Sequence, residues 1–338
     1  MEFIYEYGLF LAKAITVVAA FVIVFGLVAG AKMKHKSGKR GELFIDDISE
    51  QLTEQKQEIK RSLLSKSEQK QFDKDEKKAA KQNKDEGKKP RLFVVEFNGD
   101  VEAQQVEAMR EEISAIVQIA EKGDEVLLKL ESPGGVVHGY GLAASQLDRL
   151  KNAGLKVTAS VDKVAASGGY MMACVADKII SAPFAIIGSI GVVAQLPNIN
   201  KLLKRFDVDI EQHTAGDYKR TLTVLGENTE QGRNKFKQDL EDTHVLFKDF
   251  VQNHRQNLDI EKVSTGEHWY GLQALDLNLV DEIKTSDDFI LENVDSFRVL
   301  KMEYKIKQNV AEKLGIVTSD TLAKVFGKLT TWSTTNAK

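Results

Sequence analysis

The first long apolar segment of the chain covers residues 14–31 and contains no charged side chain. About 20 apolar residues are enough for a helix to cross the hydrocarbon core of a bilayer. The chain starts with Glu2 and Glu6 rather than with the basic residues of a cleaved signal peptide, which predicts an uncleaved anchor over 1–31 with membrane lipid as its partner. Basic residues crowd the next stretch, 32–40, and favour the cytoplasmic side of a span.

The polar stretch after the anchor predicts a linker rather than a second core. Residues 42–64 carry apolar side chains at a loose helical spacing, as in an amphipathic helix. Residues 65–90 hold almost no large apolar side chains, so they cannot bury enough surface to offset the entropy lost on ordering. We therefore expect 32–90 to be a basic juxtamembrane segment followed by a charged helical or disordered linker.

Beyond the linker, short apolar runs alternate with helical stretches. The expected strands are 91–97, 125–131, 157–162 and 178–181. Strands that alternate with helices predict a mainly parallel sheet of the α/β class, whose functional sites gather in the loops after the carboxyl ends of the strands. Residues 228–257 predict a long polar helix with one apolar side, which is either a core face or a subunit contact.

Composition narrows the classes of function. The net charge of -3 over 338 residues argues against a nucleic-acid-binding protein that works through bulk basicity. The single cysteine, Cys174, excludes a disulfide within the chain, and its apolar neighbours predict a buried, unreactive thiol. The length suits one catalytic-scale domain with accessory segments.

Two glycine-bearing loops follow predicted strands, SPGG at 132–135 and ASGG at 166–169. The second places Ser167 at the start of a helix, where a hydroxyl between small residues can attack a carbonyl and the helix N-terminus favours the negative charge that develops. Both loops can direct backbone N–H groups into one pocket, as an oxyanion hole requires. The alternative is a structural serine that caps the helix after a tight turn.

A nucleophilic serine needs a base, and no histidine of the chain comes with an evident carboxylate partner. The sequence also lacks the Gly-x-Ser-x-Gly elbow of common hydrolase triads. A lysine can act instead where burial lowers the pKa of its amine. The candidate is Lys219 in HTAGDYKRTLT, although a solvated surface lysine is the more common case.

Five motifs occur in a fixed order along the chain. They are ESPGG (131–135), VAASGGYMMA (164–173), IGSIGV (187–192), GDYKR (216–220) and WYGLQALDLNLVD (269–281). In this order they resemble membrane-associated serine peptidases of the signal peptide peptidase A family, and the anchor with its charged extension is most similar to the SohB branch. Asn278 stands where the family often has a glycine, at an expected left-handed turn that asparagine tolerates.

The resemblance implies a ClpP/crotonase-like fold of repeated β-β-α units and a Ser-Lys dyad. Ser167 matches the nucleophile and Lys219 the general base. Gly135 and Gly168 match the residues whose N–H groups hold the oxyanion, and Ser189 matches a hydroxyl that orients the lysine. No metal or organic cofactor is implied. Family members assemble into homo-oligomers, in which the lysine can come from a neighbouring subunit.

These patterns divide the chain into an anchor (1–31), a linker (32–90), a peptidase domain (91–295) and a C-terminal helical extension (296–338). The resemblance implies a serine endopeptidase of the bacterial inner membrane that hydrolyses membrane-derived or unfolded peptides through an acyl-enzyme. The side of the catalytic domain stays open, because the better-known members work on the outer face whereas the basic residues favour the cytoplasm. Two other classes also stay open: an acyl-CoA enzyme of crotonase type, and a non-catalytic membrane scaffold that retains the fold.

Overall fold

The computed structural model describes residues 7–11, 13, 16, 41–82 and 89–305. The chain divides into two compact units, Leu43–Tyr304 and the two chain ends, and the first unit carries the fold. Within the described ranges, no helix is both long enough and apolar enough for a membrane span. The predicted anchor at 14–31 lies outside the described residues, except for Thr16.

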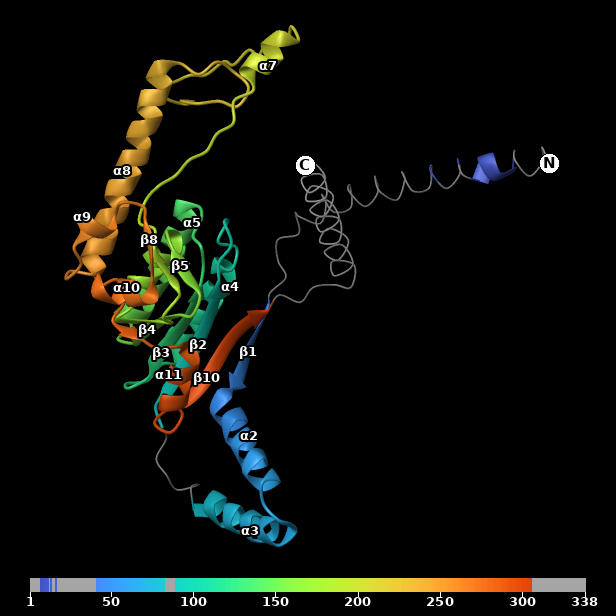
Figure 1. The fold of residues 1–338 in the computed structure, drawn as a ribbon, viewed down its shortest axis with the longest axis vertical. Helices are drawn as coiled ribbons and strands as arrows, with labels where there is room; N and C mark the ends of the chain where they lie inside the picture. The colour runs from blue at the N-terminus through green and yellow to red at the C-terminus, as the bar shows by residue number, and fades with distance from the viewer. Residues whose placement is uncertain (1–6, 12, 14–15, 17–40, 83–88, 306–338) are drawn as a thin grey trace, which may run out of the picture. The chain divides into compact units, whose positions relative to one another are not determined.

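A seven-stranded sheet forms the centre of the first unit (Figure 1). In spatial order its strands are β1 (Glu42–Asp47), β10 (Arg298–Lys305), β2 (Arg91–Asn98), β3 (Glu125–Glu131), β4 (Lys156–Val161), β6 (Lys178–Ser181) and β9 (Glu282–Ile283). Every neighbouring pair from β10 across to β9 is parallel. The predicted parallel α/β sheet is therefore confirmed.

A smaller sheet lies beside the carboxyl end of β3. It consists of β5 (Val164–Ala166), β7 (Ile186–Gly188) and β8 (His268–Tyr270). Ser132, the first residue after β3, forms a parallel bridge with Ala165 of β5. This bridge brings the loop after β3 next to the strand that precedes Ser167.

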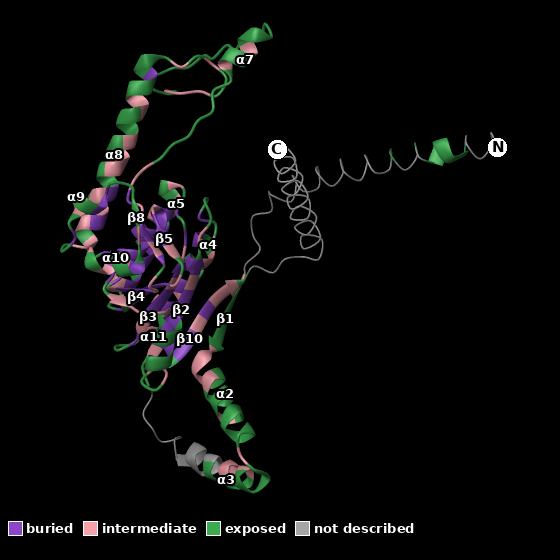
Figure 2. Cartoon of the chain, viewed as in Figure 1, coloured by how far each residue is buried: buried purple, intermediate pink, exposed green. Residues whose placement is uncertain are grey.

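Helices lie on both faces of the main sheet, with α3 and α7 away from it (Figure 1). The described helices are α2 (Ile48–Ser62), α3 (Lys66–Gln82), α4 (Val106–Ile119), α5 (Val137–Asn152), α6 (Gly168–Ala173), α7 (Asn200–Arg205), α8 (Glu230–His254), α9 (Ile260–Val263), α10 (Gly271–Asp276) and α11 (Ser286–Asn293). Phe93 and Val95 of β2 join the larger core with α4, α5 and α6, whereas Leu92 and Val94 pack with Phe289 of α11 on the other face. Figure 2 shows the resulting buried centre. Because successive side chains of a strand point to opposite faces, a strand buried on both needs a continuous apolar run such as LFVV at 92–95.

The ends of the domain differ from the sequence prediction at two points. Residues 42–47 form strand β1, and helix α2 begins only after Asp47, whose side chain accepts a hydrogen bond from the N–H of Glu50 as an N-cap. Strand β10 lies beyond the predicted domain boundary at 295 and pairs with β2, so the sheet extends one strand into the predicted helical extension. The rest of that extension, from residue 306, lies outside the described residues.

Candidate active site

Ser167 lies in a strained turn between β5 and α6. Its φ of 52° and ψ of -118° are unusual for a residue with a side chain. The backbone is held on both sides, because the N–H of Ser167 donates to the carbonyl of Gly188 at 2.8 Å and the N–H of Met171 donates to the carbonyl of Ser167 at 3.0 Å. The serine side chain makes no capping hydrogen bond to α6. Ser167 is therefore not a helix-capping serine, which was the structural alternative.

The loop after β3 packs directly against this turn. Gly134 has a φ of +88°, and a Cβ at this position would lie 2.7 Å from the carbonyl oxygen of Ala166 and 2.8 Å from the Cβ of Ser167. A Cβ at Gly168 would lie 2.4 Å from the ring of Tyr140. Close packing thus requires glycine in both motifs, and at Gly134 the positive φ favours glycine as well.

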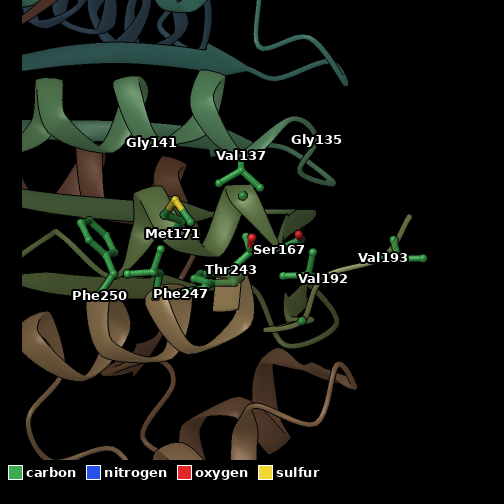
Figure 3. A pocket seen from close by; sticks show the side chains of 13 residues that line it. Gly135, Val137, Gly141, Ser167, Met171, Val192, Val193, Thr243, Phe247 and Phe250 are labelled. Atoms are coloured by element: carbon green, nitrogen blue, oxygen red, sulfur yellow. The ribbon is translucent and has the colours of Figure 1, made fainter. Parts of the chain in front are cut away.

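An apolar cavity of about 230 Å³ opens beside Ser167. Figure 3 shows Ser167 near Val192, with Met171, Phe247 and Phe250 farther along the cavity. The complete lining is Gly135, Val137, Gly141, Ser167, Gly168, Met171, Gly191, Val192, Val193, Thr243, Leu246, Phe247 and Phe250. No histidine, lysine or carboxylate is among these described residues, so within this chain the cavity offers no side-chain base.

Gly135 and Gly168 border this cavity together with Ser167. Among the described residues, neither of their N–H groups donates a hydrogen bond to a protein acceptor. Two N–H donors beside an unbonded serine hydroxyl are the groups that a tetrahedral oxyanion requires. The predicted nucleophile and the two predicted oxyanion donors are brought together by the fold.

The structure places Lys219 away from this cavity. Its side chain is exposed and has no hydrogen-bond or ion-pair partner in the part of the chain that the structure describes. The neighbouring Tyr218 packs its ring 5.7 Å from the Nζ of Lys235 in α8. Lys235 precedes the cavity residue Thr243 by two turns, or about 12 Å along the helix. Within this one chain, the side chains of Lys219 and Ser167 do not form a pair.

Ser189 follows strand β7 and lies next to the Ser167 turn in the small sheet. Gly188, the last residue of β7, is in register with Ala166 of β5. The N–H of Ser189 donates to the carbonyl of Glu267 at 2.7 Å, and the serine is half-buried. Its side chain is not part of the cavity lining. Among the described residues no lysine hydrogen-bonds to this side chain, and its predicted role toward Lys219 stays a prediction.

The sequence did not predict that α8 forms one wall of the cavity. The apolar side of this helix was evident from Phe247 and Phe250, and the predicted long helix at 228–257 is confirmed as α8. The sequence did not show which part of the protein the apolar side of α8 contacts. The structure shows that its C-terminal half borders the same cavity as Ser167.

Comparison with known proteins identifies the family. Residues 2–147 match the N-terminal part of peptidase family S49, and residues 149–299 match peptidase family S49 itself. A Haemophilus influenzae protein described as probable protease SohB is 53% identical over 322 residues, which cover 91% of each chain. The chain belongs to peptidase family S49. It is a serine peptidase of that family, and the S49 match contains both Ser167 and Lys219.

The chain is also similar to a second curated protein and, weakly, to a solved structure. A Buchnera aphidicola protein, also described as probable protease SohB, is 58% identical over 242 residues, or 70% of this chain and 72% of the relative. A solved structure described as the 1510-N membrane-bound stomatin-specific protease covers 60% of this chain and 84% of its own, with 14% identity and a TM-score of 0.41.

Proposed function

We propose that this S49 peptidase is a membrane-anchored serine endopeptidase that cleaves membrane-derived or unfolded peptides through an acyl-enzyme. The observation that carries the proposal is the setting of Ser167. Its hydroxyl is not used as a helix cap, its turn is strained, and it shares an apolar cavity with Gly135 and Gly168. The parallel sheet, the small sheet beside it and the alternating helices support a ClpP/crotonase-like fold.

The mechanism proceeds in two steps. The amine of Lys219 takes the proton of the Ser167 hydroxyl as the oxygen attacks the scissile carbonyl, and the N–H groups of Gly135 and Gly168 stabilise the oxyanion. The protonated amine then gives its proton to the leaving amine of the substrate. Water, activated by the same lysine, hydrolyses the acyl-enzyme and releases the second product.

The lysine comes from a second copy of the chain in this proposal. Residues 193–220 are almost entirely exposed and carry apolar side chains, among them Val193 and Phe206 with 91% and 69% of their surface accessible. In Figure 1, α7 of this segment lies at the opposite end of α8 from α9. An exposed apolar segment of this kind is typical of a protein interface, and burial against a neighbour would keep an amine neutral.

The cavity supports a preference for small or apolar side chains next to the cleaved bond. Its wall consists mainly of valine, methionine, leucine and phenylalanine side chains, and Thr243 is the other hydroxyl-bearing residue in the lining besides Ser167. Charged substrate side chains would lose hydration there without gaining a partner.

Labelling with a fluorophosphonate probe tests the proposed nucleophile. The full-length protein in detergent should be labelled and should cleave casein, and Ser167→Ala should abolish both. Ser62→Ala removes an exposed helix hydroxyl remote from the cavity and should change neither. Labelling of the Ser167→Ala protein at an undiminished rate would overturn the assignment. An acyl-CoA enzyme or a scaffold would leave casein intact.

We further propose that the protein resides in the bacterial inner membrane through residues 1–31. A reporter enzyme that is active on only one side of the membrane, fused after Lys338, determines the side of the catalytic domain. Extraction by detergent but not by high salt should identify the protein as integral, and loss of this behaviour should follow deletion of 1–31. Recovery of the full chain in the salt wash would contradict the anchor.

A further inference from the structure

Ser132 connects the glycine loop after β3 to the strand before Ser167. Its backbone N–H donates to the carbonyl of Val164 at 2.8 Å, and its carbonyl accepts from the N–H of Ala166 at 3.0 Å. Both ends of the three-residue strand β5 are therefore tied to this one residue. A displacement of Ser132 would move the residue that directly precedes Ser167.

The side chain of Ser132 belongs to a buried chain of hydrogen bonds. Its Oγ lies 2.5 Å from the hydroxyl of Tyr140, which donates to the carbonyl of Asp100 at 2.8 Å. The carbonyl of Asp100 can only accept, so the single hydroxyl proton of Tyr140 points to Asp100. The hydrogen bond between Ser132 and Tyr140 must therefore be donated by the Ser132 hydroxyl. The Ser132 oxygen then accepts from the N–H of Gly134 at 3.1 Å. The direction of every bond is fixed, and both side chains are 0% exposed.

The same two residues contact the start of α6. The Tyr140 ring occupies the space where a Cβ of Gly168 would lie, 2.4 Å from its Cγ. The carbonyl of Ser132 lies 2.5 Å from the position of a Cβ on Gly169. Burial raises the pKa of Tyr140, so the phenol keeps the proton that orders the chain of hydrogen bonds.

We propose that Ser132 and Tyr140 are positioning residues of the oxyanion hole. Ser132 fixes the amide of Gly134, one residue before Gly135, while Tyr140 fixes Gly168 through ring contact and Ser132 through its hydroxyl. Together they hold the two donor N–H groups at the spacing that one oxyanion needs. The inference rests on the proposed function, because it assigns a role relative to the donors named there.

Removal of either hydroxyl should act on the transition state more than on substrate binding. Tyr140→Phe keeps the ring against Gly168 but leaves Ser132 without its acceptor, and Ser132→Ala leaves the Gly134 N–H without a partner. An oxyanion donor that drifts from its position costs transition-state stabilisation, which the ground-state substrate does not use. We expect kcat to fall about 10- to 100-fold with KM changed less than about threefold.

The matched controls are Tyr170→Phe and Ser181→Ala. Tyr170 is equally buried and its hydroxyl donates to the carbonyl of Leu279 at 2.9 Å, and Ser181 is buried with its Oγ donating to the carbonyl of Ala182 at 3.0 Å. Neither lies between the two glycine loops. These variants should lose a similar amount of thermal stability while kcat stays within about twofold of the wild type.

The experiment measures kcat and KM of the full-length protein on one fluorogenic peptide, together with the melting temperature of each variant. The proposal is overturned if Tyr140→Phe and Ser132→Ala keep kcat at the level of their controls, or if KM rises while kcat is unchanged. Should Tyr140→Phe not fold, Ser132→Ala, which removes one oxygen atom, decides alone. Failure of the proposed function has a separate signature, since Ser167→Ala would then remain active.

Discussion

Ser167 and Ser189 occupy matching positions after two paired strands, and both have a φ of 52°. Ala166 and Gly188, which precede them, are partners in the register of β5 and β7. The N–H of Ser167 donates to the Gly188 carbonyl, so the turn of the candidate nucleophile is built on the backbone of the other strand. The hydrogen bond to β7 thereby holds Ser167 in a backbone conformation that serine does not favour.

Replacement of Ser167 measures this strain. Ser167→Gly should have a free energy of unfolding about 1 kcal/mol higher than Ser167→Ala, because glycine adopts a positive φ without steric cost. Both variants lack the hydroxyl, so the difference reports the backbone alone, and urea unfolding measures it. The same two substitutions at Ser145 inside α5 should give the opposite sign. Equal stability of the two Ser167 variants would show that the turn relaxes.

The contact between the two glycine loops gives a second prediction. Gly134→Ala should reduce peptidase activity at least about tenfold, because the new Cβ would meet the backbone of the Ser167 turn and displace a donor loop. Gly154→Ala is the control: its φ of +81° is also positive, but nothing lies within 4 Å of the added atom. Both variants should lose stability because alanine disfavours a positive φ, but only Gly134→Ala should lose activity in a peptide cleavage assay. Full activity of Gly134→Ala would disprove the contact.

Mixing of two inactive variants tests whether Lys219 acts in a neighbouring subunit. Ser167→Ala and Lys219→Ala should each be inactive alone. After dissociation and reassembly at equal amounts, about a quarter of the sites should combine an intact serine with an intact lysine if the interface is heterologous. Lys201→Ala, an exposed lysine of the same segment, should be fully active by itself. A mixture that stays inactive while its subunits demonstrably exchange would exclude a shared site.

The local pattern of the chain predicted the parallel sheet and the approach of the two glycine loops. It did so because the two strand segments contain the continuous apolar runs LFVV (92–95) and VLL (126–128), and both loops follow strands. The small sheet was not predicted in full, since β7 and β8 have only three residues each and their pairing joins segments about 80 residues apart. The link from Ser132 to Tyr140 and Asp100 was not predicted either, because it depends on where side chains of a loop and a helix point, which the apolar pattern does not give.

Whether Lys219 is buried could not be predicted from the sequence of one chain. The motif GDYKR predicted its role, but whether an amine is buried depends on contacts that lie far apart in the sequence or in another subunit. In the protomer the lysine is exposed. Its role as general base stays a prediction, as do the roles of Ser167, Gly135, Gly168 and Ser189.

The apolar wall from α8 predicts how substrates are selected. Phe250→Ala should lower kcat/KM for peptides with a large apolar side chain next to the cleaved bond about 5- to 30-fold, because lost apolar contact costs about 1–2 kcal/mol. Peptides with alanine at that position should be affected less. Phe184→Ala, whose ring is 78% exposed and outside the cavity, should leave the ratio unchanged. An equal loss for both classes of peptide would show that Phe250 does not contact the substrate.

A buried carboxyl in α4 gives a prediction on stability. Glu112 is 3% exposed; its Oε1 accepts from the N–H of Tyr304 at 2.8 Å, and its Oε2 has no hydrogen-bond partner in the structure. Burial raises the pKa of Glu112 to about 7, with Glu303 and Glu96 adding to the rise and the Tyr304 N–H and Lys301 opposing it. The folded state therefore binds a proton that the unfolded state releases near the ordinary value of 4.5.

The sign of the pH effect follows from this difference in proton binding. Between pH 4.5 and about 7 the folded state holds more protons than the unfolded state, so the contribution of Glu112 to stability falls as the pH rises through this window. Glu112→Gln has no proton to lose, and its stability relative to the wild type should increase from pH 5 to pH 8 by up to about 3 kcal/mol. Denaturant unfolding at the two pH values measures this change. Glu107→Gln, on the exposed side of the same helix, is the control for the exchange of a carboxylate for an amide. If the difference in stability between Glu112→Gln and the wild type were the same at both pH values, the Glu112 carboxyl would be ionised throughout this range. The hydrogen bond from Tyr304, at the end of β10, would then not depend on a protonated Glu112.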